Sequence, residues 1–283
     1  MDKQKILTRP LLGAHMSIAG GLEKALLRGQ KLGCRTIQLF TRNSNQWKER
    51  FLEETEIQVF REVRERTKID PVISHASYLI NLASPDEKVY RKSLDAMVQE
   101  IRRCEQLDID YIVLHPGFHK GRGGEWGIGR ITDALNAIHA DTAGAKVRIA
   151  LETTAGQGTA LGGSFEDLAR IIERVKEDSR LVFCLDTCHA FVAGYDLRTQ
   201  QNYIDLFKRI DTIVGMGNLR VIHLNDSKRE MGSRVDRHEN IGKGMIGEGL
   251  FRLIMGDTAL TGVPKIIETP SDIENLQLLR SFA

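Results

Sequence analysis

The stretch LVFCLD (residues 181–186) consists of five apolar residues followed at once by a carboxylate. An apolar run of this length, bounded by turn residues, is typical of a strand that is buried on both faces of a parallel sheet. Seven other short runs are also apolar, and most of them end on a polar residue, namely residues 11–15, 36–40, 72–75, 111–115, 148–152, 219–223 and 265–268. The chain therefore predicts eight parallel strands.

Amphipathic stretches lie between these runs. The spacing of their apolar residues predicts one helix over residues 90–104 and another over 165–175, the latter beginning at Ser164. About eight strand-then-helix units are the number found in the closed (β/α)8 TIM barrel, although the pattern alone leaves an open doubly wound sheet as an alternative. Because no Pro/Gly-rich linker or shift in composition interrupts the chain, we predict an α/β fold, a (β/α)8 TIM barrel, in a single domain over residues 1–283.

The composition excludes several classes of protein. Hydrophobic residues make up 41% of the 283 residues and charged residues 28%, which is typical of a globular chain rather than a disordered one. The net charge of +2 gives no strong sign of a polyanionic partner, so affinity for nucleic acid must come from local patches or bound cations. Four scattered cysteines form no disulfide framework, no apolar run is long enough for a membrane span, and the start MDKQKILTRP is not a secretory signal. We therefore expect a cytoplasmic, intracellular protein with no membrane association.

Most of the predicted strands end on a side chain that can bind a metal ion. These side chains are His15, His75, His115, Glu152, Asp186, His223 and Glu268. In a barrel the carboxyl ends of the strands converge on one face, so these groups are expected to meet over one mouth. Two short motifs add to them: Asp186 is followed by His189, and Asp236 and His238 lie two residues apart, which on an extended segment places both on one side.

A single histidine at the end of a strand is most often a hydrogen-bonded structural residue, but here the pattern repeats. Several imidazoles and carboxylates in a mouth of low dielectric constant are costly without a compensating charge, which metal ions supply. Mixed imidazole and carboxylate ligands favour zinc, with Mn2+ or Fe2+ as alternatives. More ligands than one ion needs, with a carboxylate able to bridge two ions, indicate a multi-metal site for phosphoester chemistry.

Seven longer strings occur between the third predicted strand and the last. They are HASYLINLASP (75–85), LHPG (114–117), LETTAGQG (151–158), LDTCHAFVAGYDLRT (185–199), IHLNDSK (222–228), GSRVDRHENIGKG (232–244) and IIET (266–269). Together with GAHMSIAGGL (13–22), these strings resemble endonuclease IV, the zinc-dependent apurinic/apyrimidinic endonuclease family of base-excision repair. The resemblance covers essentially the whole chain.

The resemblance implies a TIM barrel that holds three zinc ions. It assigns one ion to His75, His115 and Glu152, and the third ion to His189, Asp236 and His238. The second ion falls to Glu152, Asp186, His223 and Glu268, with Glu152 as the carboxylate that bridges two ions. His15 matches no ligand, and a supporting role beside the ligands is expected for it.

The resemblance also implies the reaction and the substrate. The family cleaves the phosphodiester bond 5′ to an abasic site in double-stranded DNA, which leaves a 3′-hydroxyl and a 5′-deoxyribose phosphate, and it removes blocking groups from 3′ ends. Glu152 and Glu268 are expected to orient the nucleophile as well as bind metal, and we expect the protein to act as a monomer. The residues expected to contact DNA are Tyr78, Leu79, Asn45, Arg234 and Arg237.

Three positions depart from the family pattern. Asn45 stands where the family often has an arginine, Ala76 replaces an aspartate, and Thr153 replaces an asparagine. None of the three removes a ligand, but the first touches DNA binding and the others touch hydrogen bonds close to the metals.

Two alternatives remain at the level of the sequence. A metal-dependent sugar isomerase or epimerase on a TIM barrel uses similar residues, but it predicts a two-metal site and gives no role to Asp236 and His238. A non-catalytic metal protein is less favoured, because closed structural zinc sites prefer cysteine ligands and the chain has no CxxC pair. We interpret Cys184 and Cys188 as packing residues. His119 and His139 match no ligand motif and are predicted to lie on the surface.

Overall fold

The computed structural model describes residues 10–47 and 50–283, so most of the charged stretch at the start lies outside the described residues. Its main sheet has eight parallel strands in the order β1-β10-β7-β6-β5-β4-β3-β2. The strands are β1 (Leu12–Ala14), β2 (Ile37–Leu39), β3 (Val72–His75), β4 (Tyr111–Leu114), β5 (Arg148–Glu152), β6 (Leu181–Asp186), β7 (Leu219–His223) and β10 (Lys265–Ile267). All eight runs predicted as strands are strands.

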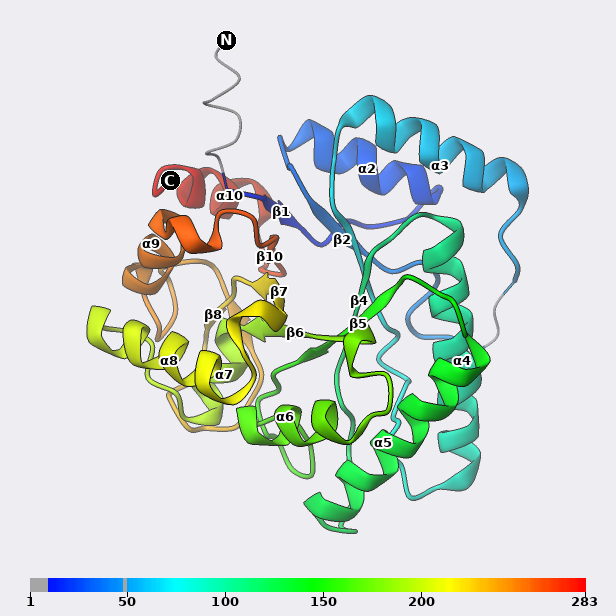
Figure 1. The fold of residues 1–283 in the computed structure, drawn as a ribbon. Helices are drawn as coiled ribbons and strands as arrows, with labels where there is room; N and C mark the ends of the chain where they lie inside the picture. Colours follow the sequence, from blue (N-terminus) through cyan, green and yellow to red (C-terminus); the bar gives the residue numbers. More distant parts are fainter. Residues whose placement is uncertain (1–9, 48–49) are drawn as a thin grey trace.

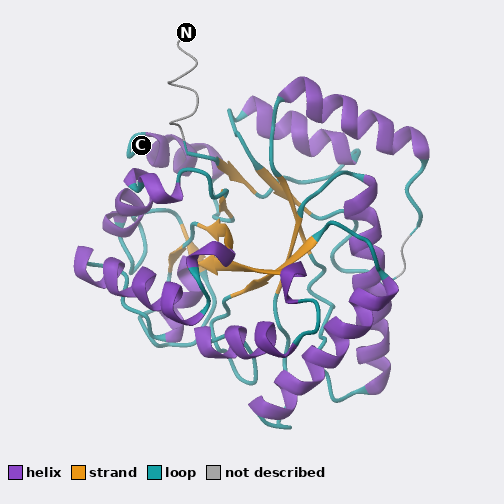
Figure 2. Ribbon diagram, in the orientation of Figure 1, coloured by secondary structure: helices purple, strands orange, loops and turns teal. Residues whose placement is uncertain are grey.

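The two outermost strands of this order come together and close the ring. A parallel bridge joins His15 to Gln38, and the backbone N–H of Met16 donates to the carbonyl of Gln38 at 2.7 Å. The ring of strands with helices outside it is visible in Figures 1 and 2. The predicted TIM barrel is therefore confirmed, and the open-sheet alternative is wrong.

The helices surround the strands on the outside (Figure 1). They are α2 (Leu22–Lys31), α3 (Glu54–Thr67), α4 (Glu87–Gln106), α5 (Gly124–Asp141), α6 (Phe165–Arg174), α7 (Thr187–Ala193), α8 (Gln200–Ile213), α9 (Glu248–Gly256) and α10 (Asp272–Arg280). The two predicted helices are confirmed as α4 and α6, and the Ser164 hydroxyl accepts from the N–H of Asp167 as predicted for an N-terminal cap. No helix in the described part of the chain is both long and apolar enough to cross a membrane.

The barrel interior is filled by apolar side chains beneath its carboxyl-terminal mouth. This inner cluster consists of Ile73, Val113, Ala150, Val182, Cys184, Val221 and Ile266. A larger cluster packs the outer faces of the strands against the helices. Polar groups at the carboxyl ends of the strands therefore lie on an apolar layer of low dielectric constant, which strengthens the charge interactions above it.

A short hairpin and the segment after it cover one side of the mouth. The hairpin pairs β8 (Asp226–Ser227) with β9 (His238–Glu239). The fully buried Asp226 carboxylate accepts from the backbone N–H groups of Gly242, Gly244 and Ile246 at 2.9–3.0 Å, and from that of Ser227 at 2.7 Å. A Cβ on Gly244 would lie 2.3 Å from the Ser227 carbonyl oxygen. We call residues 240–246 the Asp226 loop, because this one carboxylate holds its backbone.

One prediction about a histidine was wrong. His139 is only 1% exposed, on the buried side of α5, rather than on the surface. Burial lowers the pKa of its imidazole to about 4, and the nearby Arg180 guanidinium adds to this effect. The cause is the helical spacing, which places His139 on the same apolar face as Ile131 and Leu135. His119 is half-buried, and its Nδ1 accepts from the N–H of Gly123.

Candidate metal centre

Nine side chains meet at the carboxyl-terminal mouth of the barrel, and we call this set the metal centre. They are the nine residues predicted as ligands: His75, His115, Glu152, Asp186, His189, His223, Asp236, His238 and Glu268. Glu152, the last residue of β5, lies in the middle and is fully buried. Most of the others come from the last position of a strand or the position directly after it, so the parallel sheet itself brings them together.

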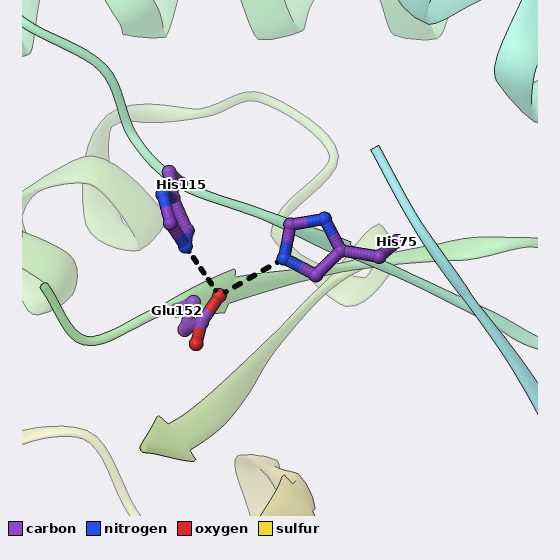
Figure 3. Close-up of side chains that lie close together, drawn as sticks. All are labelled: His75, His115 and Glu152. Carbon is purple, nitrogen blue, oxygen red and sulfur yellow. Dashed lines mark ion pairs between the residues drawn. The ribbon is translucent and has the colours of Figure 1, made fainter. Parts of the chain in front are cut away.

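The first group is formed by His75, His115 and Glu152 (Figure 3). His115 Nε2 lies 2.8 Å and His75 Nε2 lies 3.4 Å from Glu152 Oε2. The other ring nitrogen of His75, Nδ1, is 2.7 Å from the carbonyl oxygen of Ala76. Because a carbonyl can only accept, Nδ1 carries the proton and Nε2 is free to offer its lone pair to the group.

The second group joins Glu152 to Asp186, His223 and Glu268, whose ligand atoms lie within 4.8 Å of one another. His223 Nδ1 is 2.9 Å from Glu152 Oε1, 3.3 Å from Glu268 Oε2 and 3.8 Å from Asp186 Oδ2. Three carboxylates thus surround one imidazole nitrogen. This is a set of like charges that repel one another unless a cation lies between them.

The third group contains His189, Asp236 and His238. His189 Nε2 lies 3.1 Å and His238 Nε2 lies 3.2 Å from the Asp236 carboxylate oxygens. Each of these rings is held from behind, since His189 Nδ1 faces the Thr153 carbonyl at 2.8 Å and His238 Nδ1 faces the Glu268 carbonyl at 3.2 Å. The helix α7 starts directly after β6, and its first turn places His189 over the mouth while Asp186 caps the helix.

The charges of the centre act strongly on one another. Burial lowers the pKa of His238, but Asp236 and Asp186 outweigh it and raise that pKa to about 9. For His189 the same balance leaves the pKa well above its usual value. Burial raises the pKa of the Glu152 carboxyl, yet the nearby imidazoles of His115 and His223 hold it well below its usual range. The centre therefore favours ionised carboxylates and positive charge between them.

The centre also has the donor atoms and spacing that a metal ion requires. Glu152 Oε2 and His238 Nε2 are buried; His115 and Asp236 lie close to them, but neither atom makes a well-directed hydrogen bond within the described residues. Ligand atoms arranged tetrahedrally around zinc at about 2.0–2.2 Å lie about 3.3–3.6 Å apart, close to several of the separations above. Imidazole and carboxylate donors suit zinc and other divalent ions. Two thiols also lie within reach of these ligand atoms, Cys184 beside Glu152 and His223 and Cys188 beside Asp186 and His238, and burial raises the pKa of each to about 12.

Three polar residues support the centre; Gln38 and Asn225 were missed in the sequence, whereas Thr153 was expected to act on hydrogen bonds close to the metals. Gln38 lies fully buried in β2 and contacts His15, His223 and Glu268. The Asn225 amide donates to Asp186 Oδ2 at 2.7 Å, while its oxygen accepts from the N–H of Glu268 at 2.9 Å. The Thr153 hydroxyl accepts from the N–H of Asp186 at 2.9 Å. A lone amide inside an apolar run, as at Gln38, is the signal that could have found the first of them.

His15 lies where a supporting residue would be expected. Its ring is half-buried, and its Nδ1 is 3.0 Å from Gln38 Nε2 and 3.6 Å from Glu268 Oε1. The structure thus places His15 next to the second group without adding it to any of the groups of ligand atoms.

The loops predicted to contact DNA lie around the same mouth. Tyr78 is 61% exposed, and its ring centre is 5.4 Å from that of Phe40 and 5.6 Å from that of His75. Leu79 beside it is half-buried. The Ser77 hydroxyl donates to the Ser44 carbonyl at 2.5 Å, which ties this loop to the segment that carries the exposed Asn45.

Arg234 and Arg237 are both exposed on the connection between β8 and β9. The backbone N–H of Arg234 donates to the Val192 carbonyl of α7, and Arg237 directly precedes His238. Both guanidinium groups are therefore carried by the segment that also supplies Asp236 and His238.

Comparison with known proteins finds similarity along almost the whole chain. A model of the family described as the xylose isomerase-like TIM barrel matches residues 26–281. The "Probable endonuclease 4" of Chloroflexus aurantiacus is 47% identical over 279 residues, which cover 96% of this chain and 98% of that protein. The solved structure of endonuclease IV from Thermus thermophilus superposes with a TM-score of 0.86 at 34% identity, covering 96% of this chain and 98% of its own.

The sugar isomerase alternative is supported only at the level of the fold. A solved D-tagatose 3-epimerase-like protein is 18% identical, with a TM-score of 0.72, and covers 95% of this chain and 96% of its own. Likeness at this level shows a shared barrel and not a shared reaction. The third group of the metal centre, which that alternative leaves without a role, is brought together in this structure.

Proposed function

The chain belongs to the endonuclease IV family, and we propose that it repairs DNA by hydrolysing the phosphodiester bond on the 5′ side of an abasic site. The products are a 3′-hydroxyl and a 5′-deoxyribose phosphate. The observation that supports this proposal best is the meeting of three imidazole and carboxylate groups at one mouth, with Glu152 shared by two of them. A shared carboxylate between two ion sites is the arrangement that phosphoester hydrolysis uses.

Three zinc ions would be held by the three groups. His75, His115 and Glu152 hold the first, and Glu152 reaches the second together with Asp186, His223 and Glu268. His189, Asp236 and His238 hold the third. Mn2+ or Fe2+ is an alternative occupant of some sites, because imidazole and carboxylate ligands accept these ions as well.

Zinc bound in this way supplies positive charge for the phosphate oxygens and lowers the pKa of a bound water. The carboxylates divide the remaining work according to their exposure. The Glu152 side chain is 1% exposed and is held among imidazoles, so it keeps the groups together. The Glu268 side chain is 16% exposed and therefore faces the side from which substrate and water arrive. Both carboxylates are placed to orient the nucleophile, with Glu268 the nearer to solvent.

The loops above the centre would recognise the lesion. An abasic nucleotide offers no base to read, so the protein has to sense missing stacking and a sugar that leaves the helix at low cost. Tyr78 and Leu79 are placed to fill the space left in the duplex, because they lie directly above His75 and Tyr78 is largely exposed. Asn45 lies on the neighbouring segment, and Arg234 and Arg237 are placed to contact phosphates.

The same centre accounts for the cleaning of blocked 3′ ends. A blocked 3′ end also presents a phosphoester without a base beyond it, so it fits a site that reads backbone rather than bases. We propose that the protein acts as a monomer on double-stranded DNA in the cytoplasm, together with the genomic DNA.

A duplex that carries one abasic site tests this function. The zinc-loaded protein should cut the damaged strand once, on the 5′ side of the lesion, and a DNA polymerase should extend the product because its 3′ end is a hydroxyl. The same duplex without the lesion is the control and should stay intact. Protein stripped of metal by acid and a strong chelator should lose the activity and regain it with zinc. Cleavage on the 3′ side, or equal cleavage of both duplexes, would contradict the proposal.

A further inference from the structure

Gln38 lies at the point where the barrel closes. Its backbone carbonyl accepts from the N–H of Met16, and its side chain points into the mouth, fully buried. The amide nitrogen donates to Glu268 Oε1 at 2.7 Å and lies 3.0 Å from His15 Nδ1, while the amide oxygen lies 2.8 Å from His223 Nε2. One carboxamide therefore touches two residues of the second group of the metal centre.

The orientation of this carboxamide follows from its neighbours. A carboxyl group that binds a metal ion does so in its deprotonated form, so the oxygens of Glu268 only accept. The amide nitrogen must therefore face Glu268, and the amide oxygen must face His223. Because an amide oxygen cannot donate, His223 Nε2 has to carry the proton of this hydrogen bond.

The position of that proton determines which nitrogen of His223 can bind an ion. With Nε2 protonated, Nδ1 is the nitrogen that binds the ion, once the ion takes the place of the proton that faces Glu152. Nδ1 is the atom that lies 2.9 Å from Glu152 Oε1 and 3.3 Å from Glu268 Oε2. The hydrogen bond to Gln38 therefore selects the tautomer in which the lone pair of His223 points toward the second group.

Three other histidines of the centre are held differently. His75, His189 and His238 each face a backbone carbonyl with Nδ1, at 2.7, 2.8 and 3.2 Å, and point Nε2 toward the ligand atoms. No side-chain substitution removes those carbonyls. His223 has the opposite tautomer, and its partner is a side chain that can be replaced.

We propose that Gln38 is a positioning residue of the second metal site, which fixes His223 with Nδ1 toward the ion and restrains Glu268 beside it. The inference rests on the proposed function, because it assumes that the centre holds zinc. Partners behind a metal-binding imidazole typically contribute about 10–100-fold to metal affinity, and Gln38 acts on two ligands of the same ion.

The test uses the zinc-loaded full chain and two substitutions in the same part of the barrel. Gln38→Met keeps the approximate volume and removes the amide. Thr36→Val is the matched control, because Thr36 is also fully buried next to β2 and its hydroxyl donates to the Pro71 carbonyl, away from the metal centre. Release of zinc to a coloured chelator is followed with time, and the histidine ring nitrogens are observed by NMR after labelling with 15N.

Wild-type protein should show one histidine that binds metal through Nδ1 and carries its proton on Nε2, and in Gln38→Met the signal of this Nε2–H should shift and its proton should exchange faster with solvent, because its acceptor is gone. That variant should also release one ion about 10–100-fold faster, whereas Thr36→Val should behave like wild type. A wild-type spectrum without such a histidine would overturn the inference. This measurement uses wild-type protein alone and so does not depend on the folding of any variant. Unchanged release in Gln38→Met, or equal acceleration in Thr36→Val, would overturn it as well. Wild-type protein that binds no zinc at all would instead refute the proposed function.

Discussion

Asp226 and Glu152 are both fully buried carboxylates at the carboxyl-terminal mouth of the barrel, yet their surroundings differ in kind. Asp226 accepts four backbone N–H groups at 2.7–3.0 Å, so its charge is already satisfied by the chain. The Glu152 carboxylate instead lies next to the imidazoles of His75 and His115, and its Oε2 makes no well-directed hydrogen bond in the part of the chain that the structure describes. Asp226 therefore holds the backbone of the Asp226 loop, whereas Glu152 belongs to a set of side chains that a bound cation would balance.

This difference separates stability from function within one mouth of the barrel. A buried carboxylate bonded to backbone N–H groups stabilises the loop that supplies them, and its loss leaves those groups unpaired. A buried carboxylate surrounded by metal-ligand side chains contributes little to the fold by itself, because desolvation offsets its attractions. Substitution of Asp226 should therefore change the free energy of unfolding, whereas substitution of Glu152 should change the incision of abasic DNA.

The largest effect is expected at the bridging carboxylate. Glu152→Gln keeps the shape of the side chain and removes the charge that holds two cations close together. Incision of abasic DNA should fall by about 10³-fold or more, while the melting temperature changes little. Circular dichroism establishes that the variant is folded, and a gel assay measures incision. A folded variant that cuts at the wild-type rate would show that Glu152 is not the shared ligand.

The second effect is expected in the Asp226 loop. Asp226→Ala leaves several backbone N–H groups without their acceptor, which should lower the free energy of unfolding by about 3 kcal/mol. Denaturation with urea measures this loss, and metal content in the cold, where the variant remains folded, should stay near that of wild type. If Asp226→Ala instead removed metal and left stability unchanged, the two carboxylates would have been assigned the wrong way round.

The third effect concerns the loop above the centre and should change neither the zinc content nor the stability of the protein. Replacing both Tyr78 and Leu79 by alanine removes the side chains placed to fill the gap in the duplex. Binding to abasic DNA should weaken by about 2 kcal/mol, or roughly 30-fold in Kd. Fluorescence anisotropy at fixed salt measures the affinity, and zinc content and melting temperature serve as controls. An unchanged Kd would place recognition elsewhere.

The smallest effect comes from His139, a buried group whose ring nitrogens have no hydrogen-bond partner among the described residues. Its pKa in the folded protein is about 4, below the value of about 6.5 expected in the unfolded chain. Stability from the neutral imidazole is therefore present above about pH 6.5 and is lost as the pH falls toward 4. Between about pH 7 and 5.5 wild type should lose about 1 kcal/mol more than His139→Leu. Urea denaturation of both proteins at the two pH values measures the difference, and parallel curves would refute this assignment.

The sequence was enough to predict the strands and the residues that meet at their ends. Seven of the eight apolar runs end on a polar residue, and parallel strands in a barrel bring those ends to one mouth whatever the details of the loops. The supporting hydrogen bonds could not be predicted in the same way. Gln38 and Asn225 act on residues distant in the chain, and the direction of their amides depends on the register at which the strands pair.

Two other features needed the packed structure. Asp226 stands in IHLNDSK beside the candidate ligands, and only the fold shows that its partners are backbone groups about 16–20 residues further on. His139 lies two residues before Asp141, close to the polar end of α5, and resembles a surface histidine until the apolar face of α5 is placed against the barrel. In both cases the sequence gives the residue type, but the contacts of its side chain could not be predicted from the sequence.

The number of zinc ions per chain tests the central claim most directly. Metal analysis of protein saturated with zinc and freed of loosely bound ions should give a value close to three, and the same measurement on Glu152→Gln should give a lower value because two ions lose their common ligand. A wild-type protein that cuts abasic DNA while holding no zinc, or that keeps no more than one ion, would contradict the account.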